Sequence, residues 1–150
     1  MAYYPIWINF SARKILVVGG GKIAERKVTS FVGLGANIEL ISPQITARLN
    51  QFVVQGEVQW RERQYENGDE KEAFYVIAAT NDRQLNEKIV QSCAPYQLTL
   101  NVSDHTASNT MMAAMIKTEK IQVAVSTNGK QPILAKKVRD DIRTFLKEGE

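Results

Sequence analysis

The sequence predicts an α/β fold, in which a doubly wound parallel sheet is followed by a small hairpin and a final helix. Two observations lead to this class. Up to about residue 104, short apolar runs alternate with segments whose apolar residues recur at helical spacing, which is typical of strand–helix–strand units. Beyond that point the pattern changes to two strand-like runs and one amphipathic segment. We therefore expect two regions, residues 1–104 and residues 105–150.

The first strand and helix enclose a glycine-rich turn. Residues 15–18 are an apolar run, and between them and the helix stands Gly19-x-Gly21-x-x-Ala24. This is a dinucleotide-binding fingerprint when it joins a strand to a helix. Gly19 permits a tight turn, Gly21 lets the backbone approach a pyrophosphate, and Ala24 lets the helix pack on the strand. The alternative is a glycine-rich turn in another kind of α/β unit. The apolar face of the helix is made by Ala24, Val28, Phe31 and Val32.

The other elements of the first region follow in order. Gly35 ends the first helix as a left-handed cap. The second helix covers about residues 46–54, and Asp82 caps a third helix that carries Leu85, Ile89 and Cys93. Because helices separate the strands, we expect the strands to lie parallel in one Rossmann-like sheet. The expected strands after the first are residues 37–41, 58–60, 74–79 and 98–102.

The last region predicts a hairpin and a helix. Residues 112–117 and 122–126 are strand-like, and Pro132 is suited to the first turn of the final helix. The hairpin has more apolar surface than a free hairpin leaves exposed, which predicts that two copies of the chain bury it as a homodimer. Its apolar residues are Met112, Met115, Ile116, Ile121, Val123 and Val125.

Composition excludes several classes of protein. No apolar run is long enough to span a membrane, and the amino terminus lacks a basic segment followed by an apolar one, so we expect a cytoplasmic protein without a secretory signal. Cys93 is the only cysteine, which excludes an internal disulfide and favours a core residue over a nucleophile. The net charge is +3, but the basic residues are dispersed, so nucleic acid is not favoured as a partner.

Several segments together resemble a known family. Residues 19–27 form the glycine-rich loop and the start of its helix, and the later segments are Ile-Ser-Pro at 41–43, Ala-Ala-Thr-Asn-Asp at 78–82, Asn-Val-Ser-Asp at 101–104 and residues 125–135. Their order and spacing resemble the precorrin-2 dehydrogenase and sirohydrochlorin ferrochelatase family, the dehydrogenase module of siroheme synthase. The resemblance covers nearly the whole chain. It implies NAD-dependent oxidation of precorrin-2 to sirohydrochlorin, on the route to siroheme, by a homodimer. It leaves open ferrochelatase activity, in which Fe²⁺ would be a further substrate.

The resemblance also implies the site residues. Asp104 takes the catalytic position, and it follows the fifth strand, at the sheet edge where ligands of open α/β sheets bind. Oxidation releases a hydride and a proton, and we expect burial beside an apolar macrocycle to raise the pKa of Asp104 and make it a better base. The alternative for Asp104 is an ordinary turn or capping aspartate. Together with Ala24 of the fingerprint, the residues expected to contact NAD are Gly19, Gly21, Lys22, Ile23, Ser42, Pro43, Gln44, Ala79 and Thr80.

Precorrin-2, the substrate that the resemblance implies, is a polycarboxylate, and the start of the last helix offers groups to bind it. Free N–H groups at a helix start can receive a carboxylate, so we expect Ser126, Thr127 and Lys130 to bind substrate. His105 is the only histidine, which excludes a metal site built from several histidines. We interpret it as a proton shuttle or transient iron ligand beside the catalytic position, or as an exposed loop residue.

Two features that bear on function depart from the family pattern, and one departs from the usual dinucleotide site. His105-Thr106 stand where members often have an acid and a proline. Ser42 stands where a dinucleotide site usually places an acid against the ribose, so NAD rather than NADP rests on the resemblance alone. The sequence stops soon after Leu146, before the helical extension of many members, so we expect part of the pocket or interface to be missing or supplied differently. Two other functions compete with the enzyme: a dinucleotide- or tetrapyrrole-binding sensor or carrier without turnover, and a regulatory NAD(P)-binding module.

Overall fold

A computed structural model describes residues 3–148 of the chain. It divides them into two compact units, which meet in the sequence between Thr110 and Met111. The division that we expected after residue 104 therefore lies a few residues too early. Ser108 and Asn109 belong to the first unit because their side chains accept hydrogen bonds from backbone N–H groups of its last strand, at 2.8 and 2.7 Å.

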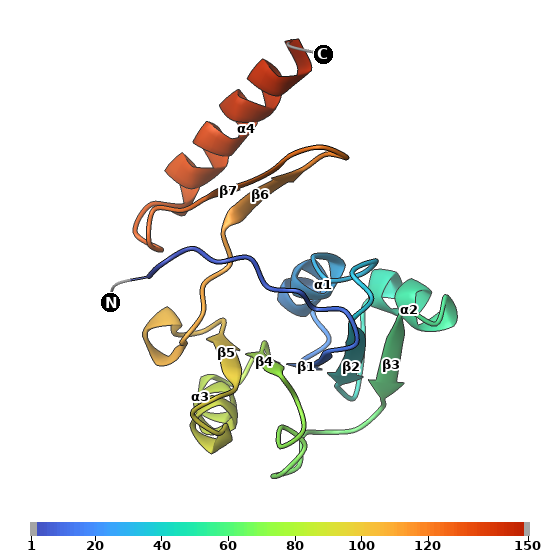
Figure 1. Ribbon diagram of the computed structural model, residues 1–150. Coiled ribbons are helices and arrows are strands. Elements are labelled where there is room, and N and C mark those ends of the chain that lie inside the picture. The colour runs from blue at the N-terminus through green and yellow to red at the C-terminus, as the bar shows by residue number, and fades with distance from the viewer. Residues whose placement is uncertain (1–2, 149–150) are drawn as a thin grey trace. The chain divides into compact units, whose positions relative to one another are not determined.

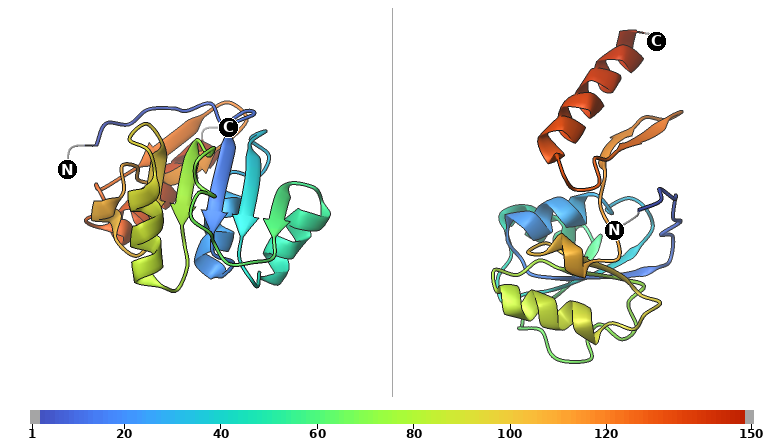
Figure 2. Two further views of the ribbon diagram at one scale, coloured as in Figure 1. Left: turned by 90° about the horizontal axis from the view of Figure 1, so that it is seen from below. Right: turned by 90° about the vertical axis from the view of Figure 1, so that its left-hand side faces the viewer.

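The first unit is a five-stranded parallel sheet in the order β3-β2-β1-β4-β5 (Figure 1). α1 and α2 cover one face of this sheet and α3 covers the other (Figure 2). This arrangement confirms the predicted doubly wound fold. The strands are β1 (Lys14–Val18), β2 (Asn37–Ile41), β3 (Val58–Arg61), β4 (Tyr75–Ala78) and β5 (Leu98–Asn101). The helices are α1 (Lys22–Thr29), α2 (Ala47–Val54), α3 (Arg83–Ser92) and the short 3₁₀ helix η1 (His105–Ala107).

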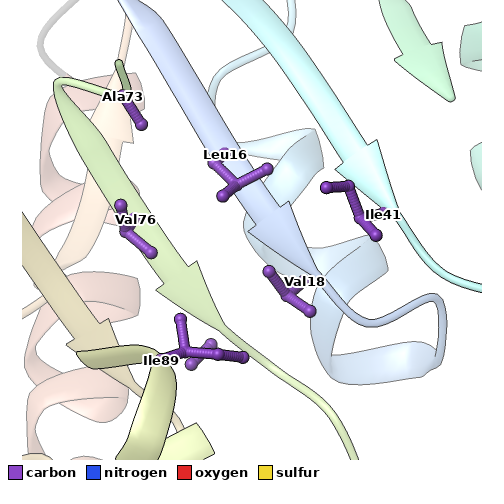
Figure 3. Close-up of a cluster of buried hydrophobic side chains, with 7 residues drawn as sticks. Leu16, Val18, Ile41, Ala73, Val76 and Ile89 are labelled. Atoms are coloured by element: carbon purple, nitrogen blue, oxygen red, sulfur yellow. The ribbon is translucent and has the colours of Figure 1, made fainter. Parts of the chain in front are cut away.

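The core of the first unit lies on both faces of the central strands. All four residues of β4 are buried, as are four of the five residues of β1. A parallel sheet covered by helices on both sides requires such continuous apolar strands, which explains why they stand out in the sequence. Figure 3 shows the cluster on the α3 side, where side chains of the central strands lie on the same face of the sheet as Ile89 of the helix. Its members are Leu16, Val18, Ile41, Ala73, Val76, Ala78 and Ile89.

The end of the first helix differs from the prediction. We expected helix up to Val32 with Gly35 as its cap, but α1 ends at Thr29. The hydroxyls of Thr29 and Ser30 donate to backbone carbonyls one turn earlier, at 2.7 and 3.2 Å, and so provide partners for the carbonyls of the last turn. Phe31 leaves the helical path and packs edge-on against two aromatic rings of the core. Gly35 does have a left-handed φ of 72°, but it lies in the turn after the helix and is not the cap of α1.

The third helix begins as predicted but ends at Ser92, so that Cys93, which we expected on the helix, follows it in extended conformation. Asp82 caps the helix, and its Oδ1 accepts hydrogen bonds from the N–H groups of Gln84 and Leu85 at 2.9 and 3.1 Å. Cys93 lies immediately after the helix and packs against the apolar cluster of Figure 3. Burial raises the pKa of the Cys93 thiol to about 11, so the thiol stays protonated at neutral pH and is a weak nucleophile.

The second unit is an antiparallel hairpin with a long helix. β6 (Ala114–Lys117) pairs with β7 (Gln122–Val125), and both strands contact α4 (Pro132–Glu148). The predicted hairpin and final helix are therefore confirmed. Large apolar side chains nevertheless remain exposed on this unit, namely Met115, Ile121, Ile133, Leu134, Val138 and Phe145. Among the described residues, no helix combines the length and apolar character needed to cross a membrane.

Candidate functional site

A cleft of about 710 Å³ opens at the carboxyl ends of the strands of the first unit. Its walls are the ends of β1, β2 and β4 and the loops that follow them. β1 and β4 are neighbours in the sheet, although the chain leaves β1 toward β2 and β3 before it returns to β4. The strand order reverses at this point, and ligands of doubly wound sheets bind in the crevice that such a reversal creates.

The glycine-rich loop contains two kinds of glycine. Gly19 has a φ of 118°, and a side chain there would collide with the backbone carbonyl of Ala79. A side chain on Gly20 would collide with the backbone carbonyl of Gln44. Gly21 differs, because its φ is −85° and a Cβ there would meet nothing within 4 Å. Contacts within the chain therefore explain why positions 19 and 20 require glycine. At Gly21 no such contact exists among the described residues, and the missing side chain leaves open space in front of α1.

The amino terminus of α1 faces this open space without a capping side chain. Gly21 is the N-cap residue, and its carbonyl accepts the N–H of Glu25 at 2.9 Å. The first helical residues are Lys22 and Ile23, both exposed, and Ala24, which is buried against the sheet. Unpaired N–H groups at a helix start and the positive end of the helix dipole attract anions. The local arrangement therefore suits a pyrophosphate.

The loop after β2 borders the cleft with a hydroxyl and contains no acid. Ser42 donates its hydroxyl to the carbonyl of Gln44 at 2.7 Å, and Pro43 lies exposed between them. Glu39 is the acid nearest to this strand end in the sequence, but it is buried within β2. Its carboxylate lies 3.0 Å from Lys14 Nζ and 2.8 Å from Arg61 Nε. Glu39 is therefore paired inside the strand layer, and Ser42 is the first polar side chain after the strand end that lines the cleft.

The loop after β4 closes the other side of the cleft. Ala79 is buried, and its N–H donates to the carbonyl of Val18 at 2.8 Å, which extends the β1–β4 pairing to the loop. Thr80 follows it and lines the cleft, as do Ser42, Pro43 and Gln44 from the opposite wall. The structure thus brings to one cleft residues that we expected to contact the cofactor and that lie far apart in the sequence. Lys22, Ile23 and Ala24 follow directly on the glycine loop.

Asp104 follows β5 and has a different environment from the one we expected. Its Oδ1 accepts hydrogen bonds from the N–H and the hydroxyl of Thr106, at 2.9 and 2.6 Å, and so caps η1. These hydrogen bonds hold the pKa of Asp104 below its usual value. Without a macrocycle beside it the side chain is 34% exposed, and the bonds from Thr106 favour its charged form. The expectation that burial beside the substrate raises this pKa concerns the complex and stays a prediction. His105 is the exposed first residue of η1.

The expected substrate residues of the second unit share one turn before α4. The hydroxyl of Ser126 accepts the N–H of Asn128, and that of Thr127 accepts the N–H of Gln131, each at 3.0 Å. Lys130 is exposed in the same turn. Thr127 thus partners the N–H of the residue that directly precedes α4. In residues 3–148, no group of three or more acidic, histidine or cysteine side chains is arranged to hold a metal ion.

The sequence alone missed three residues of the cleft region. Gly20 is central to the loop packing, but its contact with residue 44 cannot be inferred from spacing. Tyr65 lines the cleft from a polar loop that we expected only to be surface, and its hydroxyl donates to Glu70 at 2.5 Å. Asn86 is fully buried on α3. A signal for it existed, because it is a polar residue next to Leu85 on the side of the helix that faces the core.

The sheet order, the glycine loop at the reversal and the uncapped helix define a dinucleotide-binding protein of the NAD(P) class. Comparison with known proteins agrees. Residues 6–115 match the family described as putative NAD(P)-binding, and residues 118–144 match the family described as sirohaem biosynthesis protein central. The chain is 33% identical over 142 residues to the precorrin-2 dehydrogenase of Bacillus subtilis (strain 168), covering 95% of this chain and 88% of that protein. The chain therefore belongs to the precorrin-2 dehydrogenase family.

Two further comparisons define the extent of the likeness. The solved structure of SirC, precorrin-2 dehydrogenase, superimposes with a TM-score of 0.85 at 27% identity, over 95% of this chain and 70% of that one. The siroheme synthase of Neisseria meningitidis serogroup C (strain 053442) is 31% identical over 147 residues, but the chain spans only 31% of its length. The likeness thus covers one portion of the longer siroheme synthases.

Proposed function

We propose that the protein oxidises precorrin-2 to sirohydrochlorin with NAD, a step of siroheme synthesis. One observation supports the proposal most strongly, namely the open space at Gly21 in front of an uncapped helix. No contact within the described part of the chain explains why glycine stands at this position. A bound pyrophosphate accounts for it. The family membership of the chain supplies the substrate. A binding protein without turnover, which the sequence left as an alternative, is not favoured, because the named relatives are dehydrogenases.

The residues around the cleft fit the cofactor. NAD supplies the hydride acceptor when it is bound. We assign the pyrophosphate to the backbone of Gly19 and Gly21 and to the first N–H groups of α1, at Lys22, Ile23 and Ala24. The loop after β2, with Ser42, Pro43 and Gln44, borders the ribose next to the adenine. The loop after β4, with Ala79 and Thr80, borders the half of the cofactor that carries the nicotinamide.

In this proposal Asp104 receives the proton that leaves the substrate when the hydride is removed. Its low pKa keeps it charged at neutral pH, so it is ready to accept a proton. The macrocycle displaces water from the exposed side of the carboxylate, which makes the carboxylate more basic. Ser126, Thr127 and Lys130 bind substrate carboxylates, and His105 lies next to the base to pass the proton on.

The test is an anaerobic assay of the purified protein with precorrin-2 and NAD⁺. We expect NADH absorbance to grow together with the sirohydrochlorin spectrum, in equal amounts. A parallel reaction without NAD⁺ controls for spontaneous oxidation. Binding of both compounds without formation of NADH would overturn the dehydrogenase and leave a sensor or carrier.

The pH dependence tests the role of Asp104 through Thr106. Thr106→Ala removes the hydroxyl that donates to the carboxylate at 2.6 Å. This hydroxyl stabilises the charged form of Asp104, so its loss raises the pKa of the carboxyl group. As the pH is lowered, the variant therefore becomes protonated and loses activity at a higher pH than the wild type. We expect the acid limb of kcat/KM to move upward, measured as a full pH profile. Thr29→Ala, which removes an exposed hydroxyl of α1, is the control and leaves the limb in place. An unmoved limb in Thr106→Ala would mean that another group titrates.

The exposed apolar residues of the second unit support a homodimer. Ile133 and Phe145 of α4 are 85% and 74% exposed, and Met115 and Ile121 of the hairpin region are exposed as well. Burial of such a surface between two copies is favourable. We expect light scattering at micromolar concentration to give twice the 16.9 kDa of one chain. Phe145→Glu should lower this mass, whereas Lys136→Glu, also on α4, should not. A monomer mass for the unaltered protein would contradict the prediction.

A further inference from the structure

Asn86 is a fully buried polar residue that contacts two loops at once. Its Oδ1 accepts hydrogen bonds from the N–H and the hydroxyl of Thr80, at 3.0 and 2.7 Å. Its Nδ2 donates to the carbonyl of Thr80 at 3.0 Å and to the hydroxyl of Ser103 at 2.6 Å. Both donors and both acceptor sites of the amide are therefore used.

The two loops that Asn86 joins have different roles in the proposed reaction. Thr80 lines the cofactor cleft, and Ser103 directly precedes Asp104. The register between β4 and β5 ends with Ala78 and Asn101. Beyond it, the N–H of Val102 still donates to the carbonyl of Ala78 at 3.1 Å. Past that bond, the hydrogen bonds of Asn86 connect the loop after β4, at Thr80, with the loop after β5, at Ser103.

The loop that carries Asp104 is also held from its own strand. The Oδ1 of Asn101 accepts the N–H groups of Ser103 and Asp104, at 2.9 and 3.2 Å. These bonds fix the shape of the loop, and the bond from Asn86 to Ser103 fixes its place relative to Thr80. A buried amide costs free energy unless it is fully hydrogen-bonded, so an apolar residue beside Leu85 would be the simpler choice for packing. What the amide adds is the connection between the loops.

We propose that Asn86 is a positioning residue, which holds the carboxylate of Asp104 in register with the cofactor bound beside Thr80. This inference rests on the proposed function. A reaction that removes a hydride and a proton from one substrate needs both acceptors in place together, and small displacements of either one are costly to the rate. Asn86 touches neither substrate nor cofactor and acts through the two loops.

The test uses two pairs of matched variants. Asn86→Asp keeps the shape but replaces the donating Nδ2 by an oxygen, and Gln97→Glu makes the same change in another buried amide, which donates to the carbonyls of Glu70 and Ala73. Ser103→Ala removes only the link to the Asp104 loop, and its control is Ser92→Ala on α3. We expect Ser103→Ala to lower kcat about tenfold with the Kd for NAD within about twofold of wild type, and Asn86→Asp to lower kcat further.

The controls separate positioning from stability. Gln97→Glu should lower the melting temperature while kcat stays within about twofold of wild type. If Ser103→Ala and Asn86→Asp keep the kcat of their controls, the inference is overturned. Should Asn86→Asp not fold, the comparison of Ser103→Ala with Ser92→Ala decides.

A second measurement does not need turnover. Hydrogen exchange of the backbone N–H groups of Ser103 and Asp104 reports how firmly the loop is held. Exchange should be faster in Asn86→Asp and Ser103→Ala than in Gln97→Glu and Ser92→Ala, and equal rates would overturn the inference. A wild-type protein that produces no NADH would overturn the proposed function instead, and the exchange rates would then decide whether Asn86 holds the loop.

Discussion

Asp104→Asn is expected to lower kcat by about 10²–10⁴-fold, with the affinity for NAD nearly unchanged. The amide has the size of the carboxylate, and its oxygen can still accept the hydrogen bonds of Thr106 that cap η1. The variant should therefore keep the local fold. It loses the charge and the ability to take up a proton from the substrate. Single-turnover formation of NADH measures the chemical step, and titration with NAD measures binding.

Two further variants show whether the carboxylate itself matters. Asp104→Glu retains the charge but moves it by one methylene, so its rate should fall between those of the wild type and Asp104→Asn. Thr106→Ala loses part of the cap and keeps the carboxylate, and it should remain far more active than Asp104→Asn at neutral pH. Near-normal turnover in Asp104→Asn would exclude Asp104 as the base and leave it as a capping residue.

Gly21→Leu is expected to abolish NAD binding without unfolding the protein. The φ of Gly21 is −85°, which any residue adopts, and a Cβ at this position would meet nothing within 4 Å. The fold therefore tolerates a side chain here. A leucine would fill the space in front of α1 where the pyrophosphate is proposed to bind, and we expect a loss of at least about 100-fold in affinity, or more than about 2.7 kcal/mol. Calorimetric titration with NAD measures it.

A graded series makes this result specific. Gly21→Ala adds a single methyl group and should weaken binding less than leucine does. Thr29→Leu places the same large side chain at the other end of α1, where it should leave the affinity for NAD unchanged. Melting temperatures of all three variants establish that they fold. Equal affinity for NAD in Gly21→Leu and wild type would show that the loop is only a structural turn and does not bind the cofactor.

The sequence predicted the fold well for a physical reason. In a parallel sheet covered on both faces, each central strand is an uninterrupted apolar run, such as residues 15–18, and the helices between them have one apolar face. Such patterns are local and can be recognised without coordinates. The end of α1 was predicted wrongly because Phe31 fits the helical period but packs instead into an aromatic cluster made by distant residues.

The same distinction applies to the site. The sequence by itself determined the glycine loop and the capped start of α3. It also determined that Ser42, Thr80 and Asp104 each follow the end of a strand. Because the strands are parallel, these ends lie at one edge of the sheet.

Only the structure decided that Asp104 caps η1 through Thr106, two residues along the chain, a role that the sequence had offered as an alternative. Only the tertiary structure decided that Asn86 joins two loops. The bond from Asn86 to Ser103 joins residues 17 positions apart, and no periodicity of the sequence encodes a contact at that distance, because folding alone brings the two residues together.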